Sequence, residues 1–409
     1  MRNMINKETI AEVITLQREA LNRAEIGTLR EEIKEIRVID SFALIITGVR
    51  RCGKSTLLHQ LIKNQKKVYY LNLEDPRLGG FDLNDFNKLE AIMEELYGRG
   101  GIYFFDEIQN VPQWEKFIRY LIDKKEKIVI TGSNASLLSK ELGTRLTGRH
   151  LKYELFPFSF KEFLSIKKDK PSLDSFKEYL SQGGFPEFLK KNNSAILHEL
   201  LSDIVMKDIA IRFNIKNTEI LKKIAVFLIS NVGTEFSYNS IKKMFAIKSV
   251  QSVIDYVSFF EDAYLLFSIP RFSYSFKQQQ VNPKKVYSID NGFSNSNSAS
   301  FSKDNGKMLE NLVFLALRRK HKNIFYFQDK NECDFVIKEK EKITQAIQVC
   351  YDLNEENKDR EINGMLEALK EFKLSKGLIL TFKQDDEFKV EGKTIKVLPV
   401  WKWLLENQI

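Results

Sequence analysis

The chain has 409 residues and a formal net charge of +9, and this length favours two or three domains over a single core. Its three cysteines form no closely spaced pair and its four histidines form no zinc pattern, which argues against disulfides and a structural zinc. No apolar run reaches the roughly 18–20 residues of a membrane helix and no signal-peptide core is present, so we expect a cytoplasmic protein with no membrane partner.

The first informative segment is a glycine-containing loop between an expected strand and an expected helix. Residues 42–47 are apolar and largely β-branched or aliphatic, as in a buried parallel strand, and residues 56–62 carry apolar side chains at helical spacing. Between them, residues 48–55 read Gly-Val-Arg-Arg-Cys-Gly-Lys-Ser, which matches the phosphate-loop pattern G-x-x-x-x-G-K-[ST]. The alternative is a glycine turn before an ordinary helix, although the pattern arises by chance in only on the order of 1% of chains this long.

Such a loop binds phosphate because glycine permits backbone angles that turn successive N–H groups inward, while the helix N-terminus adds partial positive charge. Lys54 would reach the β- and γ-phosphates of ATP, and the Ser55 hydroxyl would bind Mg²⁺. The residues expected to bind the nucleotide are Gly48, Val49, Arg50, Arg51, Cys52, Gly53, Lys54, Ser55 and Thr56.

A second nucleotide motif follows about 50 residues later, where the apolar run 102–105 ends in Asp106 and Glu107. Parallel strands deliver their last residues to the sheet edge where ligands bind. Asp106 would therefore hold Mg²⁺ (the Walker B role), and Glu107 would orient and deprotonate the attacking water. The alternative is a pair of carboxylates that only face solvent at a strand end.

Two further catalytic candidates lie beyond the next strand, residues 127–132. Asn134 would lie beside the γ-phosphate and the lytic water, with Ser133 as the other candidate, and an N-cap role for the following helix is the structural alternative. Arg149, with Arg145 as the less favoured candidate, could reach the γ-phosphate of a neighbouring subunit as an arginine finger, which would require a homo-oligomer. An exposed structural arginine is the alternative.

The order of these motifs resembles that of predicted ATPases of the AAA+ superfamily from bacteria and archaea. The resemblance implies an α/β fold with a P-loop NTPase parallel sheet, Walker A, Walker B, sensor-1 and arginine-finger roles at the positions named above, and a domain of unknown function behind the ATPase. The stretches that carry it are Leu-Asn-Leu-Glu-Asp-Pro (71–76), Phe-Asp-Glu-Ile-Gln (105–109), Thr-Gly-Ser-Asn (131–134), Leu-Thr-Gly-Arg-His (146–150) and Pro-Phe-Ser-Phe-Lys-Glu-Phe (157–163).

Behind an ATPase domain expected over residues 1–160, residues 161–210 predict a helical lid or linker and residues 211–290 predict a winged-helix domain. The second prediction rests on three helical stretches followed by a β-hairpin whose strands include 265–269, 271–276 and 284–289. Residues 212–285 carry 11 basic and 5 acidic side chains, which fits a nucleic-acid surface or a solvated basic face. Winged helices bind DNA or proteins, so both stay open as partners. The DNA contacts would be Lys242, Lys243, Lys248, Ser249, Gln251 and Ser252.

The Ser- and Asn-rich stretch 291–307 favours a loop or linker, and residues 300–409 predict a small α/β domain. Its order of helices and strands resembles the restriction-endonuclease-like fold, whose active site takes a helix Glu, a strand Asp and then Glu/Gln-x-Lys. Glu310, Asp334 and Gln348 match, but Cys350 stands where the lysine is expected. A neutral thiol cannot supply the positive charge, so we expect a degenerate, silent site unless Lys338, Lys340 or Lys342 replaces the lysine in space.

The sequence therefore predicts Mg²⁺-dependent ATP binding and hydrolysis by an AAA+-like ATPase, coupled to DNA or protein through the C-terminal domains. One alternative is an ATP-dependent binding switch with negligible turnover. The other is a DNA-cleaving enzyme that uses the C-terminal domain.

Overall fold

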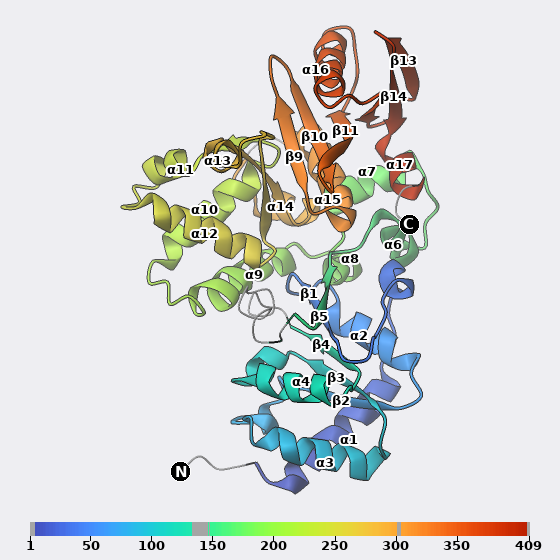
Figure 1. The fold of residues 1–409 in the computed structure, drawn as a ribbon, viewed down its shortest axis with the longest axis vertical. Coiled ribbons are helices and arrows are strands. Elements are labelled where there is room, and N and C mark those ends of the chain that lie inside the picture. Colours follow the sequence, from blue (N-terminus) through green and yellow to red (C-terminus); the bar gives the residue numbers. More distant parts are fainter. Residues whose placement is uncertain (1–4, 133–145, 147, 301–303, 407–409) are drawn as a thin grey trace. The chain divides into compact units, whose positions relative to one another are not determined.

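The computed structural model describes residues 5–132, 146, 148–300 and 304–406 of the chain (Figure 1). It divides into two compact units, Met1–Leu155 and Phe156–Ile409, which are described separately.

The N-terminal unit is built on a five-stranded, fully parallel sheet in the order β2-β3-β4-β1-β5. The strand that leads into the glycine loop lies inside the sheet, between β4 and β5, and is buried along its length, as its apolar sequence predicted. This confirms the mixed α/β fold with a P-loop NTPase-type parallel sheet. The strands are β1 (Ala43–Gly48), β2 (Val68–Asn72), β3 (Ile102–Asp106), β4 (Ile128–Thr131) and β5 (His150–Leu155).

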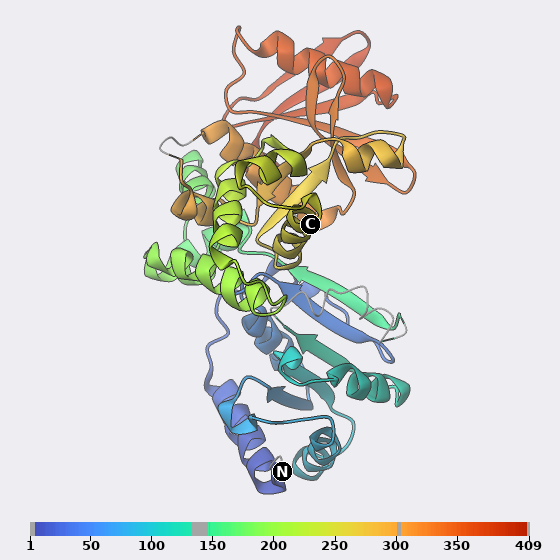
Figure 2. The same ribbon diagram turned by 90° about the vertical axis from the view of Figure 1, so that its left-hand side faces the viewer.

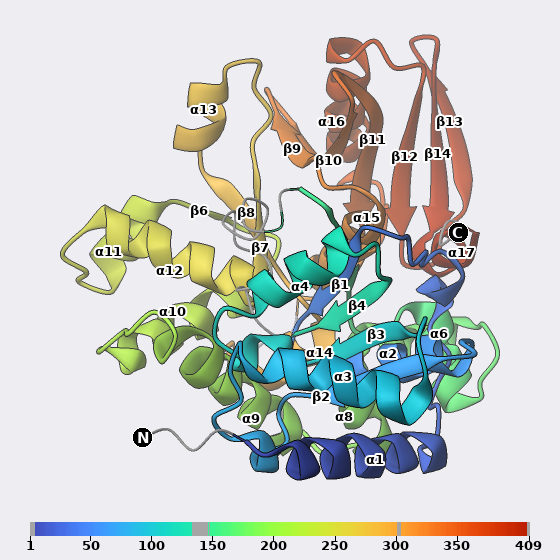
Figure 3. The ribbon, with the colours of Figure 1, turned by 60° about the horizontal axis from the view of Figure 1, so that its bottom comes forward.

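Helices cover this sheet on both faces (Figure 3). Apolar residues of α1, α3 and α4 form one core with alternate residues of the strands, such as Ile45 and Phe105. Helix α2 contacts β1, β3 and β4 from the other face. The α-helices are α1 (Lys7–Arg23), α2 (Lys54–Lys63), α3 (Asp85–Tyr97) and α4 (Trp114–Asp123), and the short 3-10 turns are η1 (Glu31–Lys34), η2 (Pro76–Leu78) and η3 (Ile108–Asn110).

The C-terminal unit begins with helices and continues into a small antiparallel sheet in the order β6-β8-β7 (Figure 2). The three predicted helices are present. The hairpin differs from the prediction, because 271–276 is not a strand and a short helix connects β7 to β8. In chain order the elements are α6 (Phe160–Lys167), α7 (Leu173–Gln182), α8 (Pro186–Lys191), α9 (Ala195–Asp203), a π-helix η5 (Ile204–Ala210), α10 (Thr218–Ser230), β6 (Glu235–Phe236), α11 (Tyr238–Met244), α12 (Val250–Asp262), β7 (Leu266–Pro270), α13 (Phe276–Val281) and β8 (Lys284–Ser288).

The expected linker after β8 is wrong for its first part, where the chain forms helix α14 (Asn291–Asn297). The Asp290 carboxylate accepts a hydrogen bond from the Phe293 amide and caps this helix, and residues 291–294 are buried. Tertiary packing and a cap therefore override a composition that is usually found in loops.

The last part of the unit is a six-stranded mixed sheet in the order β13-β14-β12-β11-β10-β9. Strands β11, β12 and β14 are parallel to one another, and the pairs at both edges are antiparallel. The sequence predicts helices at 308–317 and 361–372 and strands at 324–327, 333–337, 344–350 and 377–381. The structure confirms them as α15, α16 and β9 to β12, whereas β13, β14 and α17 were not predicted. The bounds are α15 (Asn305–Lys320), β9 (Ile324–Gln328), β10 (Glu332–Glu339), β11 (Lys342–Cys350), α16 (Lys358–Glu371), β12 (Lys376–Thr381), β13 (Asp386–Val390), β14 (Lys393–Pro399) and α17 (Val400–Glu406).

None of the helices in the described ranges is both long enough and apolar enough to cross a membrane.

Candidate nucleotide-binding site

The glycine loop joins the end of β1 to the start of α2 and requires both of its glycines. Gly48 has a φ of 148° and Gly53, which precedes the helix, has a φ of 102°. A Cβ atom at position 48 would lie 2.1 Å from the Leu155 carbonyl oxygen, so no larger residue fits between β1 and β5. The pattern read from the sequence therefore corresponds to a sharply turned backbone at the carboxyl edge of the sheet.

Lys54 is folded into this loop and is only 5% exposed. Its ammonium donates hydrogen bonds to the carbonyl oxygens of Gly48 and Val49, both at 3.0 Å. These acceptors are uncharged, so phosphate oxygens would be stronger partners for the same ammonium. The Lys54 ammonium therefore lies inside the loop on two uncharged oxygens.

Ser55 and Asp106 meet at the same edge of the sheet. Asp106 ends β3 and is 1% exposed. Its carboxylate accepts a hydrogen bond from the Thr131 hydroxyl, and the nearby Ser55 hydroxyl also favours its charged form. Burial raises the pKa of Asp106, so the site favours a cation that compensates its charge. A hydroxyl and a carboxylate side by side are the oxygen ligands that Mg²⁺ takes in nucleotide sites, so these residues fit the metal.

Glu107 follows Asp106 in the left-handed backbone region, with a φ of 52°. Its amide donates to the Thr131 hydroxyl oxygen at 3.3 Å, and its carboxylate accepts a hydrogen bond from the Gln109 side-chain amide. The Gln109 side-chain oxygen is buried and has no hydrogen-bond partner within the described structure. The Glu107 carboxylate is therefore held at the edge of the site by a side chain two residues further along.

Sequence reasoning missed Thr131, which lies at the end of β4. This strand runs between β1 and β3, so its last residue lies between the glycine loop and Asp106. Thr131 is fully buried and contacts both Asp106 and Glu107. Its signal in the sequence was its position at the end of an apolar run, two residues before Ser133 and three before Asn134.

Sequence reasoning also missed Arg30, which is 1% exposed. Its guanidinium donates to the Cys52 carbonyl oxygen at 2.9 Å, and its backbone amide donates to the Gln60 side chain at 3.1 Å. The Gln60 amide in turn donates to the carbonyl oxygens of Ile26 and Thr28. Through these hydrogen bonds the segment before β1 supports both the glycine loop and helix α2. No local pattern in the sequence marks this contact.

Cys52 points into the protein and is fully buried. Burial raises the pKa of its thiol, so it remains a protonated packing residue within the loop.

Arg149 lies at the opposite edge of the sheet from the glycine loop. Its carbonyl oxygen accepts from the Ala43 amide at the start of β1, and its guanidinium pairs with Asp123 at 2.6 Å. Strand β1 separates this point from its own loop by roughly 16 Å, at about 3.3 Å per residue. Any action of Arg149 on a nucleotide would thus be on another subunit. Asn134, Ser133 and Arg145 lie outside the described residues.

The residues predicted for the C-terminal domain also come together. Glu310 comes from α15, and Asp334 and Gln348 face each other on β10 and β11, where the Asp334 amide donates to the Gln348 side-chain oxygen at 3.0 Å. Lys338, Lys340 and Lys342 do not join them, because they lie at the far end of the β10–β11 hairpin. Cys350 is 7% exposed at the end of β11.

With its parallel sheet, glycine loop and adjoining Ser55–Asp106 pair, the N-terminal unit is a P-loop ATPase module of the AAA+ type. Comparisons of the sequence with protein families agree. A family described as AAA domain matches residues 40–164, and two families described as Domain of unknown function (DUF8612 and DUF4143) match residues 173–304 and 305–403.

Full-length relatives place the chain more narrowly. It is 38% identical to the uncharacterized protein MJ1544 of Methanocaldococcus jannaschii, over 98% of this chain and 97% of the relative. It is 32% identical to an uncharacterized protein of Haemophilus influenzae, over 89% of this chain and 94% of the relative. The chain therefore belongs to the same family as these two uncharacterized proteins.

Solved structures give weaker likenesses. AMPPCP-bound DnaA from Aquifex aeolicus aligns with a TM-score of 0.28 at 13% identity, over 64% of this chain and 93% of that protein. A DNA polymerase III gamma subunit-related protein from Thermotoga maritima aligns with a TM-score of 0.25 at 13% identity, over 59% of this chain and 100% of that protein. Scores this low establish no shared arrangement beyond the family assignment above.

Proposed function

We propose that the protein binds ATP together with Mg²⁺ in the loop of residues 48–56 and hydrolyses it. The observation that carries the proposal is the position of the Ser55 hydroxyl, at the start of the helix after the glycine loop, beside the Asp106 carboxylate at the end of β3, whose charged form it favours. A phosphate loop alone would support binding only. A carboxylate beside its serine supports a metal ion at the phosphates as well.

The chain's own residues would divide the work. Lys54 would exchange its two carbonyl partners for phosphate oxygens, and Ser55 and Asp106 would hold the Mg²⁺, which supplies charge neutralisation at the β- and γ-phosphates. Glu107 would accept the proton of the attacking water, held in orientation by Gln109. Asn134 would orient the same water, and Arg149 would act on a neighbouring subunit, which makes a homo-oligomer part of this proposal.

Phosphate release tests the proposal against a switch that binds ATP without turnover. We expect steady release in Mg²⁺, none in EDTA, and a loss of at least about 100-fold in Asp106→Asn, while the variant still binds ATP in a separate titration. Tight ATP binding by the wild-type protein with release no faster than in Asp106→Asn would reject hydrolysis and support the switch.

A second function, DNA binding by residues 211–290, is favoured by a specific observation. The order α10-β6-α11-α12-β7-α13-β8, with its three-stranded antiparallel sheet, supports a winged-helix arrangement apart from the short helix α13 between the last two strands. Lys243, Lys248 and Gln251 are exposed on α11 and at the start of α12. Helix α12 is the third helix, and in helix-turn-helix proteins the N-terminal residues of the recognition helix contact base edges.

A salt-dependent DNA titration tests this function. We expect Lys248→Ala to weaken binding and to lower the slope of log K against log salt by about 1. Lys190→Ala, an exposed lysine on α8, is the matched control and should leave the slope unchanged. Equal slopes for wild-type protein and both variants would leave a protein partner as the occupant of this region.

A further inference from the structure

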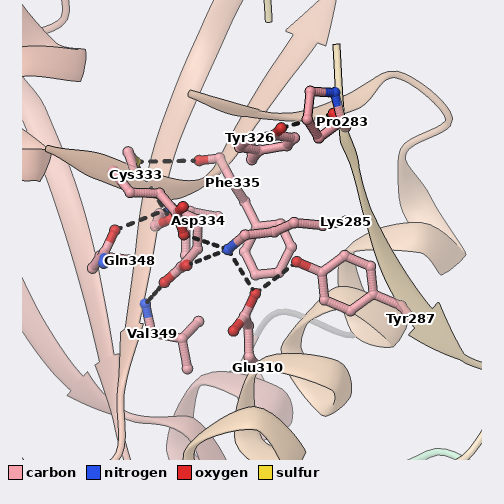
Figure 4. A network of polar contacts seen from close by, with 12 residues as sticks. Pro283, Lys285, Tyr287, Glu310, Tyr326, Cys333, Asp334, Phe335, Gln348 and Val349 are labelled. Carbon is pink, nitrogen blue, oxygen red and sulfur yellow. Dashed lines mark hydrogen bonds and ion pairs between the residues drawn. The ribbon is translucent and has the colours of Figure 1, made fainter. Parts of the chain in front are cut away.

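A buried lysine lies at the centre of several acidic groups in the C-terminal unit (Figure 4). Lys285, on β8, is 3% exposed. Its ammonium lies 2.9 Å from an Asp334 oxygen, 3.1 Å from a Glu310 oxygen and 2.5 Å from a Glu332 oxygen. These four residues and Tyr287 are called the Lys285 cluster below. They come from β8, α15 and β10, which are far apart in the sequence.

The surrounding carboxylates keep this lysine charged. Burial alone would lower the pKa of Lys285, but Asp334 and Glu310 oppose this effect and hold the pKa well above its usual value. A buried charge that lacked such partners would cost several kcal/mol. Lys285 is therefore a permanent cation at the pH of a cell.

The acidic groups are held by further hydrogen bonds. The Tyr287 hydroxyl donates to the same Glu310 oxygen that accepts from Lys285, at 2.7 Å, and the Val349 amide donates to the second Asp334 oxygen at 2.9 Å. The backbone at Gly233 packs against Glu310, since a Cβ atom there would lie 2.8 Å from its other oxygen. These contacts hold the Glu310 and Asp334 carboxylates in place, each with one oxygen against the Lys285 ammonium.

Gln348, the third residue of the nuclease-like pattern, is engaged as well. Its side-chain oxygen accepts from the Asp334 amide, and its side-chain nitrogen donates to Glu361 at 2.6 Å. Within the described part of the chain, no group of three or more His, Cys, Asp or Glu side chains is arranged to hold a metal ion.

The cluster also lies on a seam between two sheets. The Phe272 amide, just after β7, donates to the Tyr326 carbonyl oxygen on β9 at 2.7 Å, and the Tyr326 hydroxyl donates to the Pro283 carbonyl oxygen just before β8 at 2.8 Å. Lys285 lies 5.8 Å from the centre of the Tyr326 ring. The ion pairs therefore connect the small sheet β6-β8-β7 to the six-stranded sheet.

We propose that Lys285 is the resident cation of this cluster: it occupies the position between Glu310 and Asp334 that a divalent metal ion would need, and it ties the small sheet to the six-stranded sheet. The lysine absent at position 350 is not replaced by a catalytic one. A lysine from β8, 65 residues earlier in the sequence, fills the metal position itself. The C-terminal domain is then a metal-independent structural module and not a nuclease.

The test uses the full-length, nucleotide-free protein and its melting temperature in EDTA and in millimolar Mn²⁺. We expect wild-type protein and Asp334→Asn to respond equally to the change from EDTA to Mn²⁺, and no nicking of plasmid DNA in Mn²⁺. A rise in melting temperature with Mn²⁺ that Asp334→Asn abolishes would overturn the proposal, because the carboxylates would then hold a metal.

Variants test the role of the charge. We expect Lys285→Met to lower the melting temperature by at least about 5 °C, because three carboxylates lose their cation. The matched control is Lys284→Met, which changes the neighbouring lysine. The Lys284 ammonium contacts the Tyr238 hydroxyl at 3.0 Å, and its loss should lower the melting temperature much less. The double variant Lys285→Met with Asp334→Asn should recover part of the loss, since one stranded charge is gone.

Two results would overturn the structural part of the proposal: a Lys285→Met protein as stable as wild type, or a double variant no more stable than Lys285→Met alone. If Lys285→Met does not fold, the wild-type and Asp334→Asn responses to Mn²⁺ still decide whether a metal or the lysine fills the site.

Discussion

Two buried lysines, Lys54 in the N-terminal unit and Lys285 in the C-terminal unit, have opposite kinds of partner. Both are nearly inaccessible, at 5% and 3% exposure, so burial does not distinguish them. Lys54 donates to two uncharged carbonyl oxygens, whereas Lys285 contacts three carboxylates. Uncharged partners can be exchanged for a phosphate at little cost, but charged ones cannot. The charge of the groups that accept from the ammonium, and not the lysine itself, therefore indicates which of the two sites can bind a ligand.

The largest expected effect follows from removing the exchangeable lysine. Lys54→Ala should weaken the binding of a fluorescent ATP analogue at least about 100-fold, since the phosphates lose a buried charge-assisted contact. Lys63→Ala, in the last turn of the same helix, is the control and should bind as wild type does. Unchanged affinity in Lys54→Ala would remove the distinction between the two lysines.

The carboxylates of the N-terminal site can be separated by role. Glu107→Gln should retain ATP affinity but lower the rate of phosphate release on the order of 100-fold or more, because the amide cannot accept a proton from water. Glu74→Gln changes an exposed carboxylate after the neighbouring strand and should turn over normally. Normal turnover in Glu107→Gln would mean that another group is the base.

The sequence could predict the P-loop module because its motifs are contiguous. Gly48, Gly53 and Lys54 lie in one loop, and Asp106 ends an apolar run, so local pattern and strand order suffice. Thr131 and Arg30 escaped prediction because their roles depend on which strands are neighbours and on how the segment before β1 wraps the loop. Such contacts have no periodic signal.

The same limit explains the C-terminal unit. Glu310 and Asp334 matched a known pattern, but the residue between them, Lys285, belongs to a stretch predicted only as a hairpin strand of another domain. The lysines expected as replacements, Lys338, Lys340 and Lys342, are close to Cys350 in the sequence. The antiparallel pairing of β10 with β11 places them at the far end of the hairpin. Helix α14 was missed because a Ser- and Asn-rich composition masked the cap at Asp290.

A medium effect is expected from removing the Thr131 hydroxyl, which donates a hydrogen bond to Asp106. Thr131→Val keeps the shape of the side chain but removes its hydrogen bond to Asp106, and should reduce the Mg²⁺-dependent part of ATP affinity about 10-fold. Thr131→Ser restores a hydroxyl and should recover most of the affinity. The measurement is ATP binding at a series of Mg²⁺ concentrations. Equal Mg²⁺ dependence in all three proteins would show that Thr131 does not tune Asp106.

The smallest expected effect concerns a third buried carboxylate, Asp290, whose partners are backbone amides. It accepts from Gly184 at 2.6 Å and from Phe293 at 2.9 Å, and burial raises its pKa to about 6 from an ordinary 3.8. The folded protein therefore keeps a proton that the unfolded chain releases between these values. The stability contributed by this group is complete below pH 3.8 and is lost as the pH rises through about 6.

Asp290→Asn, which mimics the protonated carboxyl, should remove this dependence. The melting temperature of Asp290→Asn minus that of the wild-type protein should therefore increase by a few °C from pH 5 to pH 8. Wild-type Asp290 loses stability as it ionises over that interval, whereas the amide does not ionise. Asp304→Asn replaces an exposed N-cap carboxyl on α15 and should show a constant offset. If the difference between Asp290→Asn and wild type were also constant with pH, backbone amides would compensate the buried charge at Asp290 as fully as the ammonium does at Asp334.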